Sequence, residues 1–114
     1  MMTLETLRQF GADTATGMGR CMNNEAFYLR LVNLALSDKN FDKLAQSLNA
    51  GDTHAAFEAA HALKGALGNL SLTPLYDPAS ALTELLRGNG SLEEAARLSE
   101  EIFRQKEALA KLAE

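Results

Sequence analysis

The sequence predicts an all-α protein folded as an antiparallel up-down four-helix bundle with short N-terminal helices. Its composition is rich in Ala, Leu, Glu and Lys and poor in β-branched residues, which favours helices over strands. Long segments with apolar residues at helical spacing are joined by short connections, which is typical of antiparallel neighbours. The length of 114 residues suits one domain with a single core, which we expect to span residues 1–114.

Charge and composition argue against several classes of function. The formal net charge of -4 disfavours a nucleic-acid binder with a broad basic surface. No apolar run approaches the roughly 20 residues of a membrane span, and the N-terminus shows no secretion signal. The single cysteine, Cys21, excludes an internal disulfide framework, fits a reducing compartment and is expected to be buried. We therefore expect a cytoplasmic, monomeric protein, and the initiating Met favours a free-standing one.

The N-terminal half is expected to contain two short helices and one long one. Residues 3–10 carry apolar side chains at spacing three and are followed by Gly11, a suitable C-cap. Asp13 or Thr14 is suited to cap the next short helix. Residues 24–50 contain no Gly or Pro, and apolar residues recur there every seven positions. This seam consists of Phe27, Leu34, Phe41 and Leu48. One long helix is expected, although the polar run at 37–40 leaves open a break with Asp38 as the cap of a second helix.

Three helices are expected in the second half. Gly51 ends the long helix, and Asp52 is a good N-cap for a helix that extends to about Leu72. Thr73 is a candidate N-cap with proline at the next position, although Pro78 allows an irregular start or a later one near Ala79. The turn at 88–90 precedes Ser91, which forms a capping box with Glu94 at the start of the last helix. The apolar positions expected on that last helix are Leu92, Ala95, Leu98, Ile102, Leu109 and Leu112.

His61 is expected on the solvent-facing side of the helix over residues 52–72. The core stripe of that helix comprises Ala56, Ala59, Leu63, Ala66, Leu67 and Leu70. The opposite side brings His61 together with His54, Phe57, Glu58, Lys64, Gly65 and Gly68. Two glycines on an exposed helical face lower stability by roughly 0.5–1 kcal/mol each relative to alanine. A plausible compensating gain is room for another macromolecule to approach the ring of His61.

The residues around His61 resemble a known family. His61-Ala-Leu-Lys64-Gly65, followed by Gly68-Asn69-Leu70, resembles the HxxKG signature of histidine-containing phosphotransfer domains. The resemblance extends over nearly the whole chain through further matching positions. These positions are Gly17-Met-Gly-Arg20, Tyr28, Asp52, and Leu82 to Leu86 with Glu84. Departures are Ala35 in place of the usual phenylalanine, Gly68 where alanine is commoner, and Ser71 where glycine is frequent.

The resemblance implies a four-helix bundle that relays phosphoryl groups between receiver domains of response regulators or hybrid histidine kinases. Such domains have no catalytic activity of their own and no cofactor, because the receiver brings the Mg²⁺ and the acidic site. A neutral imidazole nitrogen is a suitable phosphoryl acceptor. We therefore expect His61 to be the phosphoacceptor and Lys64, one turn on, to offset phosphoryl charge. Phe57, Glu58, Gly65 and Gly68 are expected to contact the partner.

Other interpretations of the same residues remain open at this point. The phosphodonor domain of a chemotaxis-type histidine kinase shares the HxxKG signature. If the chain were such a domain, it would be a fragment of the kinase. A kinase dimerisation domain fits less well, because Ala62 follows the histidine where an acidic residue is typical. A third alternative is a helical adaptor that binds receivers without phosphorylation. A metal site at His54 and His61 lacks further ligands at good spacing.

Overall fold

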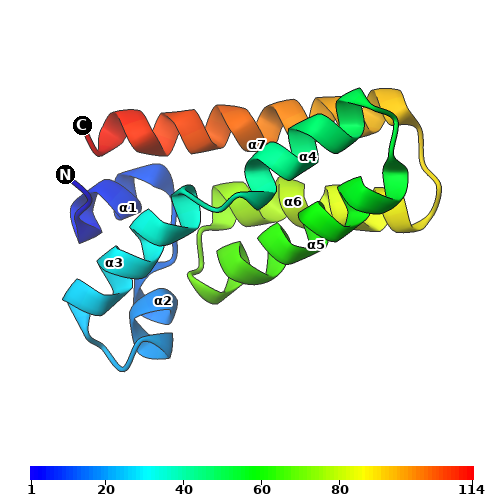
Figure 1. The fold of residues 1–114 in the computed structure, drawn as a ribbon. Helices are drawn as coiled ribbons and strands as arrows, with labels where there is room; N and C mark the ends of the chain where they lie inside the picture. The colour runs from blue at the N-terminus through cyan, green and yellow to red at the C-terminus, as the bar shows by residue number, and fades with distance from the viewer.

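The computed structural model describes residues 1–114 and contains helices but no strands (Figure 1). In chain order the helices are α1 (Leu4–Phe10), α2 (Thr14–Arg20), α3 (Glu25–Leu36), α4 (Asn40–Asn49), α5 (Thr53–Asn69), α6 (Thr73–Arg87) and α7 (Leu92–Leu112). The molecule measures 40 × 25 × 20 Å along its principal axes. No helix has both the length and the apolar character needed to cross a bilayer. The predicted all-α class is confirmed.

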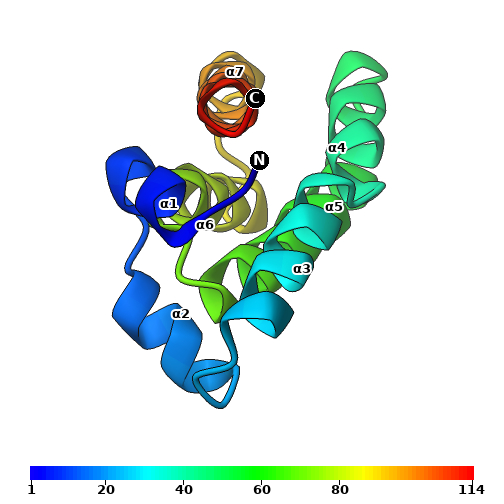
Figure 2. The same ribbon diagram turned by 90° about the vertical axis from the view of Figure 1, so that its left-hand side faces the viewer.

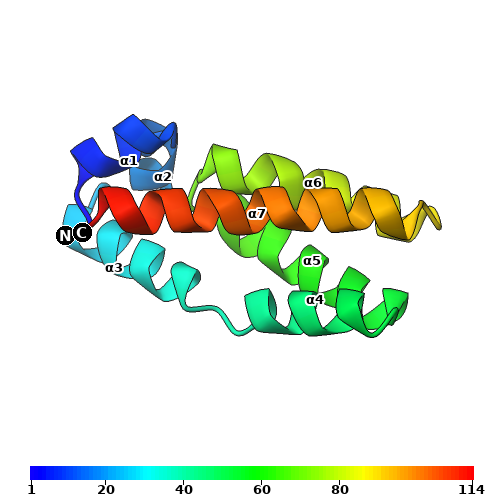
Figure 3. The same ribbon diagram turned by 90° about the horizontal axis from the view of Figure 1, so that it is seen from above.

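Helices α4 to α7 form the body of the fold. Consecutive helices in this group pack against one another, so that α5 lies between α4 and α6, and α7 packs on α6. In the end-on view, α4 and α7 stand apart at the top, while α5 and α6 occupy the middle (Figure 2). Seen from above, α1 and α2 lie on one side of α7 and α3 lies on the other, at the end where both termini meet (Figure 3).

Helix α5 supplies the centre of the core. Its fully buried residues are Ala56, Ala59, Ala60, Leu63 and Leu67, and Leu70 follows them with 7% exposure. The predicted stripe is therefore confirmed apart from Ala66, which is half-buried, and Ala60 widens it. Small side chains on the buried face let neighbouring helices approach closely. This packing fixes the rotation of α5, and hence the direction in which its opposite face points.

The expectation of one long helix over residues 24–50 is wrong. Helix α3 ends at Leu36, and α4 begins at Asn40. The carboxylate of Asp38 accepts a hydrogen bond from the backbone N–H of Asn40 at 2.8 Å, while Lys39 occupies the cap position without a side-chain bond. The break that the polar run allowed is thus present, with Asp38 stabilising the start of α4.

The break also changes which side chains of α3 are buried. In the expected seam Phe41 is buried, but Phe27 and Leu34 are 41% and 57% exposed. Helix α3 instead buries Tyr28, Val32 and Ala35. Because the chain leaves helical geometry for three residues, the sevenfold register does not continue from α3 into α4. The phenol of Tyr28 makes a buried hydrogen bond to the carbonyl of Leu70 at 2.8 Å, which fixes the rotation of α3.

The N-terminal helices bind the C-terminal end of α5. The last carbonyls of a helix have no partner within it. Here the carbonyls of Gly68, Leu70 and Ser71 accept hydrogen bonds from the guanidinium of Arg20, the phenol of Tyr28 and the backbone N–H of Asp13. Burial is the main cause that raises the pKa of Tyr28 to about 12, so the phenol remains a donor at neutral pH.

Most of the predicted helix ends are confirmed. Gly11 has φ of 103° at the end of α1, and Asp52 accepts a hydrogen bond from the N–H of Ala55 at 3.1 Å. Ser91 accepts a bond from the N–H of Glu94 at 3.1 Å, which is one half of the capping box. Helix α6 starts one residue earlier than predicted, because its N-cap is Leu72.

Some of the irregular positions have local explanations. Pro78 lies inside α6, so the later start near Ala79 does not occur. Ser71 has φ of 56°, in the left-handed region that favours glycine. On α7, Ala95, Ile102 and Leu109 are buried, whereas Leu92 and Leu112 at the ends of the predicted stripe are 49% and 42% exposed.

Candidate functional site

His61 lies near the middle of α5, on the face turned away from the core. Its side chain is exposed, as the sequence predicts, and its ring makes no hydrogen bond or ion pair within the chain. The flanking positions Ala60 and Leu63 are fully buried, so the helix cannot rotate the ring inward without exposing core residues. Both ring nitrogens of His61 are therefore left for an external partner.

An aromatic side chain holds one side of the His61 ring. Phe57, one turn earlier on α5, stacks on it with 5.8 Å between ring centroids and 14° between ring planes. The guanidinium carbon of Arg87, from the end of α6, lies 5.2 Å from the centroid of the Phe57 ring, which is cation–π geometry. Phe57 is half-buried, so it supports the imidazole and also offers apolar surface beside it.

Lys64 lies one turn beyond His61 and is held by an ion pair to α6. Its Nζ is 3.9 Å from Oε1 of Glu84, and Oε2 of Glu84 is 3.6 Å from Nε of Arg87. Ion pairs this exposed contribute about 0–1 kcal/mol. The cost of releasing Lys64 from Glu84 is therefore small, and its ammonium group is available to another anion on this face of α5.

The two glycines of this face have different surroundings. A Cβ atom built on Gly65 meets nothing within 4 Å, so the surface beside His61 is open there. A Cβ on Gly68 would lie 2.9 Å from the ring of Tyr76, a residue of α6. The expectation that Gly68 also leaves open surface is therefore wrong, because the ring of Tyr76 fills that space. Gly68 permits the close contact between the end of α5 and the start of α6.

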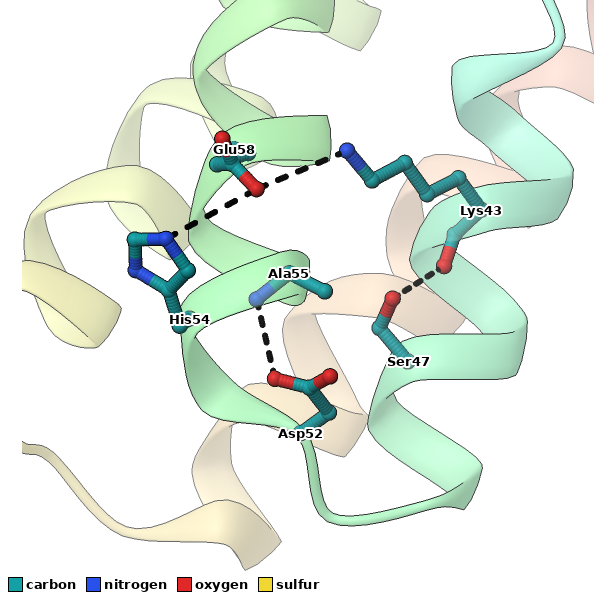
Figure 4. A network of polar contacts seen from close by, with 6 residues as sticks. All are labelled: Lys43, Ser47, Asp52, His54, Ala55 and Glu58. Atoms are coloured by element: carbon teal, nitrogen blue, oxygen red, sulfur yellow. Dashed lines mark hydrogen bonds and ion pairs between the residues drawn. The ribbon is translucent and has the colours of Figure 1, made fainter.

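Glu58 belongs to a polar network at the N-terminal side of the site. Its Oε1 lies 3.7 Å from Nζ of Lys43 on α4 and 3.8 Å from Nε2 of His54 (Figure 4). Asp52 in the same view caps α5. His54 is highly exposed, and no group of three or more His, Cys, Asp or Glu side chains in the chain could hold a metal ion.

A hollow of about 530 Å³ continues from His61 toward the end of α5. Beside the predicted residues His61, Lys64, Gly65 and Gly68, it is lined by Asp13, Arg20, Asn69, Ser71, Thr73 and Tyr76. Sequence reasoning did not place Arg20, Tyr76 or Arg87 at the site, since they come from α2 and α6. The only sequence feature that could have indicated the contact with Tyr76 is Gly68. A glycine inside a helix can make room for a side chain from another helix of the same chain.

The HxxKG resemblance implies phosphoryl transfer at His61, and on that expectation substituting Lys64 by alanine slows the transfer by roughly tenfold, or about 1.4 kcal/mol of lost charge stabilisation. Lys64 pairs only with exposed Glu84, so thermal unfolding is expected to change little. The single-turnover rate with a phosphorylated receiver measures this effect. Lys111→Ala, at the exposed end of α7, is the matched control, and equal rates for the two variants would show that Lys64 is a bystander.

Together, these features describe an all-helical domain with an exposed histidine on its central helix. A family model described as the Hpt domain matches residues 31–114, and the chain belongs to this family. Membership implies a phosphotransfer role in two-component signalling and interaction with receiver domains. Domains of this family are phosphocarrier modules that are generally not catalytic. A search of the curated proteins and a search of the solved structures gave no significant match.

Proposed function

We propose that His61 accepts a phosphoryl group from the aspartate of one receiver domain and passes it to another. In the uptake step a neutral ring nitrogen of His61 attacks phosphorus, and the bond between phosphorus and the aspartyl oxygen breaks. The aspartate leaves as a carboxylate, and the phosphoryl group is then bonded to imidazole. Transfer to the second receiver reverses these changes with a new aspartate as the acceptor.

The observation that carries this proposal is the free, exposed imidazole of His61 between a cation and an open surface. Phosphoryl transfer requires in-line approach of the donor and offset of charge, with little covalent help from the protein. Gly65 leaves the approach free of side-chain atoms, and Phe57 supports the ring from one side. Lys64 leaves Glu84 for the phosphoryl oxygens when the new negative charge forms.

The remaining chemistry belongs to the partner in this proposal. The receiver supplies Mg²⁺ and the acidic site, and this chain supplies the acceptor ring, one cation and a docking face. Phe57, Glu58 and Gly65 form that face directly, while Gly68 acts through the neighbouring Tyr76.

In the proposed up-and-down bundle, α3 and α4 together take the place of the first of four helices.

Enlarging Gly65 to glutamine is expected to weaken receiver binding at least about tenfold, because a side chain in the centre of an interface blocks close packing. The same change raises helix propensity by about 0.5–1 kcal/mol, so the domain is not expected to lose stability. Titration calorimetry with a receiver measures the affinity. Ala96→Gln, at an exposed position of α7 outside the hollow, is the control, and unchanged affinity of the Gly65 variant would contradict a need for clearance.

Phosphoryl transfer from phosphorylated receiver domains to the purified chain tests the proposal. Receivers are loaded with radioactive phosphate, separated from their kinase and mixed with the chain. We expect the label to move to the chain within the lifetime of the aspartyl phosphate, and to move on when a second receiver is added. Binding of receivers without any transfer of label would contradict the relay and identify an adaptor instead.

A further inference from the structure

Arg20 extends the candidate site beyond the residues of α5. It is the last residue of α2, and its Nη1 donates a hydrogen bond to the carbonyl of Gly68. Arg20 lines the same hollow as His61 and Lys64. A cation at the carbonyl end of α5 also fits the direction of the helix dipole. The guanidinium is thus anchored on the face that carries His61.

The charge of Arg20 is not neutralised by an ion pair within the chain. No carboxylate oxygen lies within 4.0 Å of its guanidinium, and the group uses one of its five N–H donors. The one acidic residue of the hollow is Asp13, whose carboxylate accepts bonds from the backbone N–H and the hydroxyl of Thr16 at 3.1 and 2.7 Å. These bonds lower the pKa of Asp13, and the charge of Arg20, which lies beyond ion-pair distance, adds a smaller lowering. The hollow therefore holds two cations, Arg20 and Lys64, against one anion that already has partners.

A partner that reaches His61 also covers Arg20. Gly68 lies seven residues after His61, which is about 10 Å along a helix. A standard protein interface covers about 800 Å² on each partner, a patch roughly 30 Å across. Gly65 leaves the surface between the two positions open. The anchored guanidinium therefore lies inside the footprint of any domain centred on His61, and it loses little freedom when a partner binds.

We propose that Arg20 is a docking residue for the receiver domain and that its free guanidinium edge binds a carboxylate side chain of that domain. The inference rests on the proposed function, and it adds a specific contact from outside α5. The carbonyl that anchors Arg20 belongs to Gly68, about 10 Å along α5 from His61, so we assign Arg20 a contribution to association and not to holding the phosphoryl group. A charge at this position selects receivers that carry an acidic residue at the matching point and disfavours those with a basic one.

Receiver affinity is measured in a His61→Gln background, so that binding is observed without phosphoryl transfer. The receiver used is one that phosphorylates the unaltered chain. Arg20→Gln is expected to raise the dissociation constant about tenfold at low ionic strength, and the difference should shrink at roughly 0.5 M salt. Arg20→Lys keeps the charge and should restore part of the loss. Arg97→Gln, an exposed arginine of α7, removes the same charge outside the hollow and should have little effect.

A second variant, Asp13→Asn, distinguishes a charge contact from a structural role by the direction in which it changes receiver affinity. Asp13→Asn keeps the cap acceptor and removes the anion, so the charge contact predicts tighter binding, by about twofold. If Arg20 acted only by holding α2 in place, Arg20→Gln would weaken binding while Asp13→Asn, which keeps the cap, would not tighten it, and that result would overturn the inference. It would also be overturned if Arg20→Gln and Arg97→Gln bound alike. In either case the unaltered chain still takes up phosphate, whereas failure of the proposed function would abolish that uptake.

Discussion

Replacement of His61 by glutamine is expected to abolish phosphoryl uptake from a phosphorylated receiver and to leave the fold intact. Glutamine removes the nucleophilic ring but is polar and a good helix former. The ring of His61 makes no hydrogen bond within the chain and stacks only on half-buried Phe57, so the free energy of unfolding should change by about 1 kcal/mol or less. Transfer of radioactive phosphate measures the first effect, and thermal unfolding followed by circular dichroism measures the second.

His54→Gln provides the matched control for this result. His54 lies on the same helix and is more than four-fifths exposed, and its contact is an exposed ion pair with Glu58. We expect this variant to take up phosphate at the rate of the unaltered chain. Stoichiometric uptake by the His61 variant would contradict the assignment of the acceptor, and loss of uptake in both variants would point to damage of the docking face.

Alanine at Gly17 is expected to destabilise the domain by about 1–3 kcal/mol, because overpacking costs outweigh the gain in helix propensity. The added Cβ would lie 2.5 Å from the phenol oxygen of Tyr28, which is fully buried and donates to the carbonyl of Leu70. The ring cannot move without weakening that bond. Propensity alone would stabilise the helix by about 0.5–1 kcal/mol. Chemical denaturation measures the sign directly.

Gly19→Ala on the same helix isolates the steric effect. A Cβ at Gly19 meets nothing within 4 Å, so this variant should gain stability from helix propensity. Opposite signs at Gly17 and Gly19 are the expected result. Stabilisation by both substitutions would show that α2 has room to shift and that the contact with Tyr28 does not fix its position.

The central helix and its ends were predictable because their causes are local. Asp52 caps α5 through a bond to a residue three positions on, and Gly51 adopts φ of 73° where α4 has ended. The core stripe of α5 repeats at the helical period, so the outward direction of His61 follows from the pattern alone. His61, Lys64 and Gly65 lie within two turns of one helix, and a spacing of three or four residues predicts their proximity.

The parts that were not predictable depend on contacts between distant segments. The rotation of α3 involves the bond from Tyr28 to the carbonyl of Leu70, which lies 42 positions away. A sevenfold apolar repeat cannot indicate that bond, so the exposure of Leu34 was missed. Arg87 reaches Phe57 from the end of α6, and nothing in the local sequence of α6 indicates that contact.

Mapping the phosphate after transfer from a receiver tests the central claim most directly. Trypsin cleavage after Lys43 and Lys64 would place both histidines on one peptide, so fragment ions must distinguish His54 from His61. We predict a phosphate that is labile in acid, stable in base and located on His61. An acid-stable phosphate, or one located on any other residue, would contradict the account.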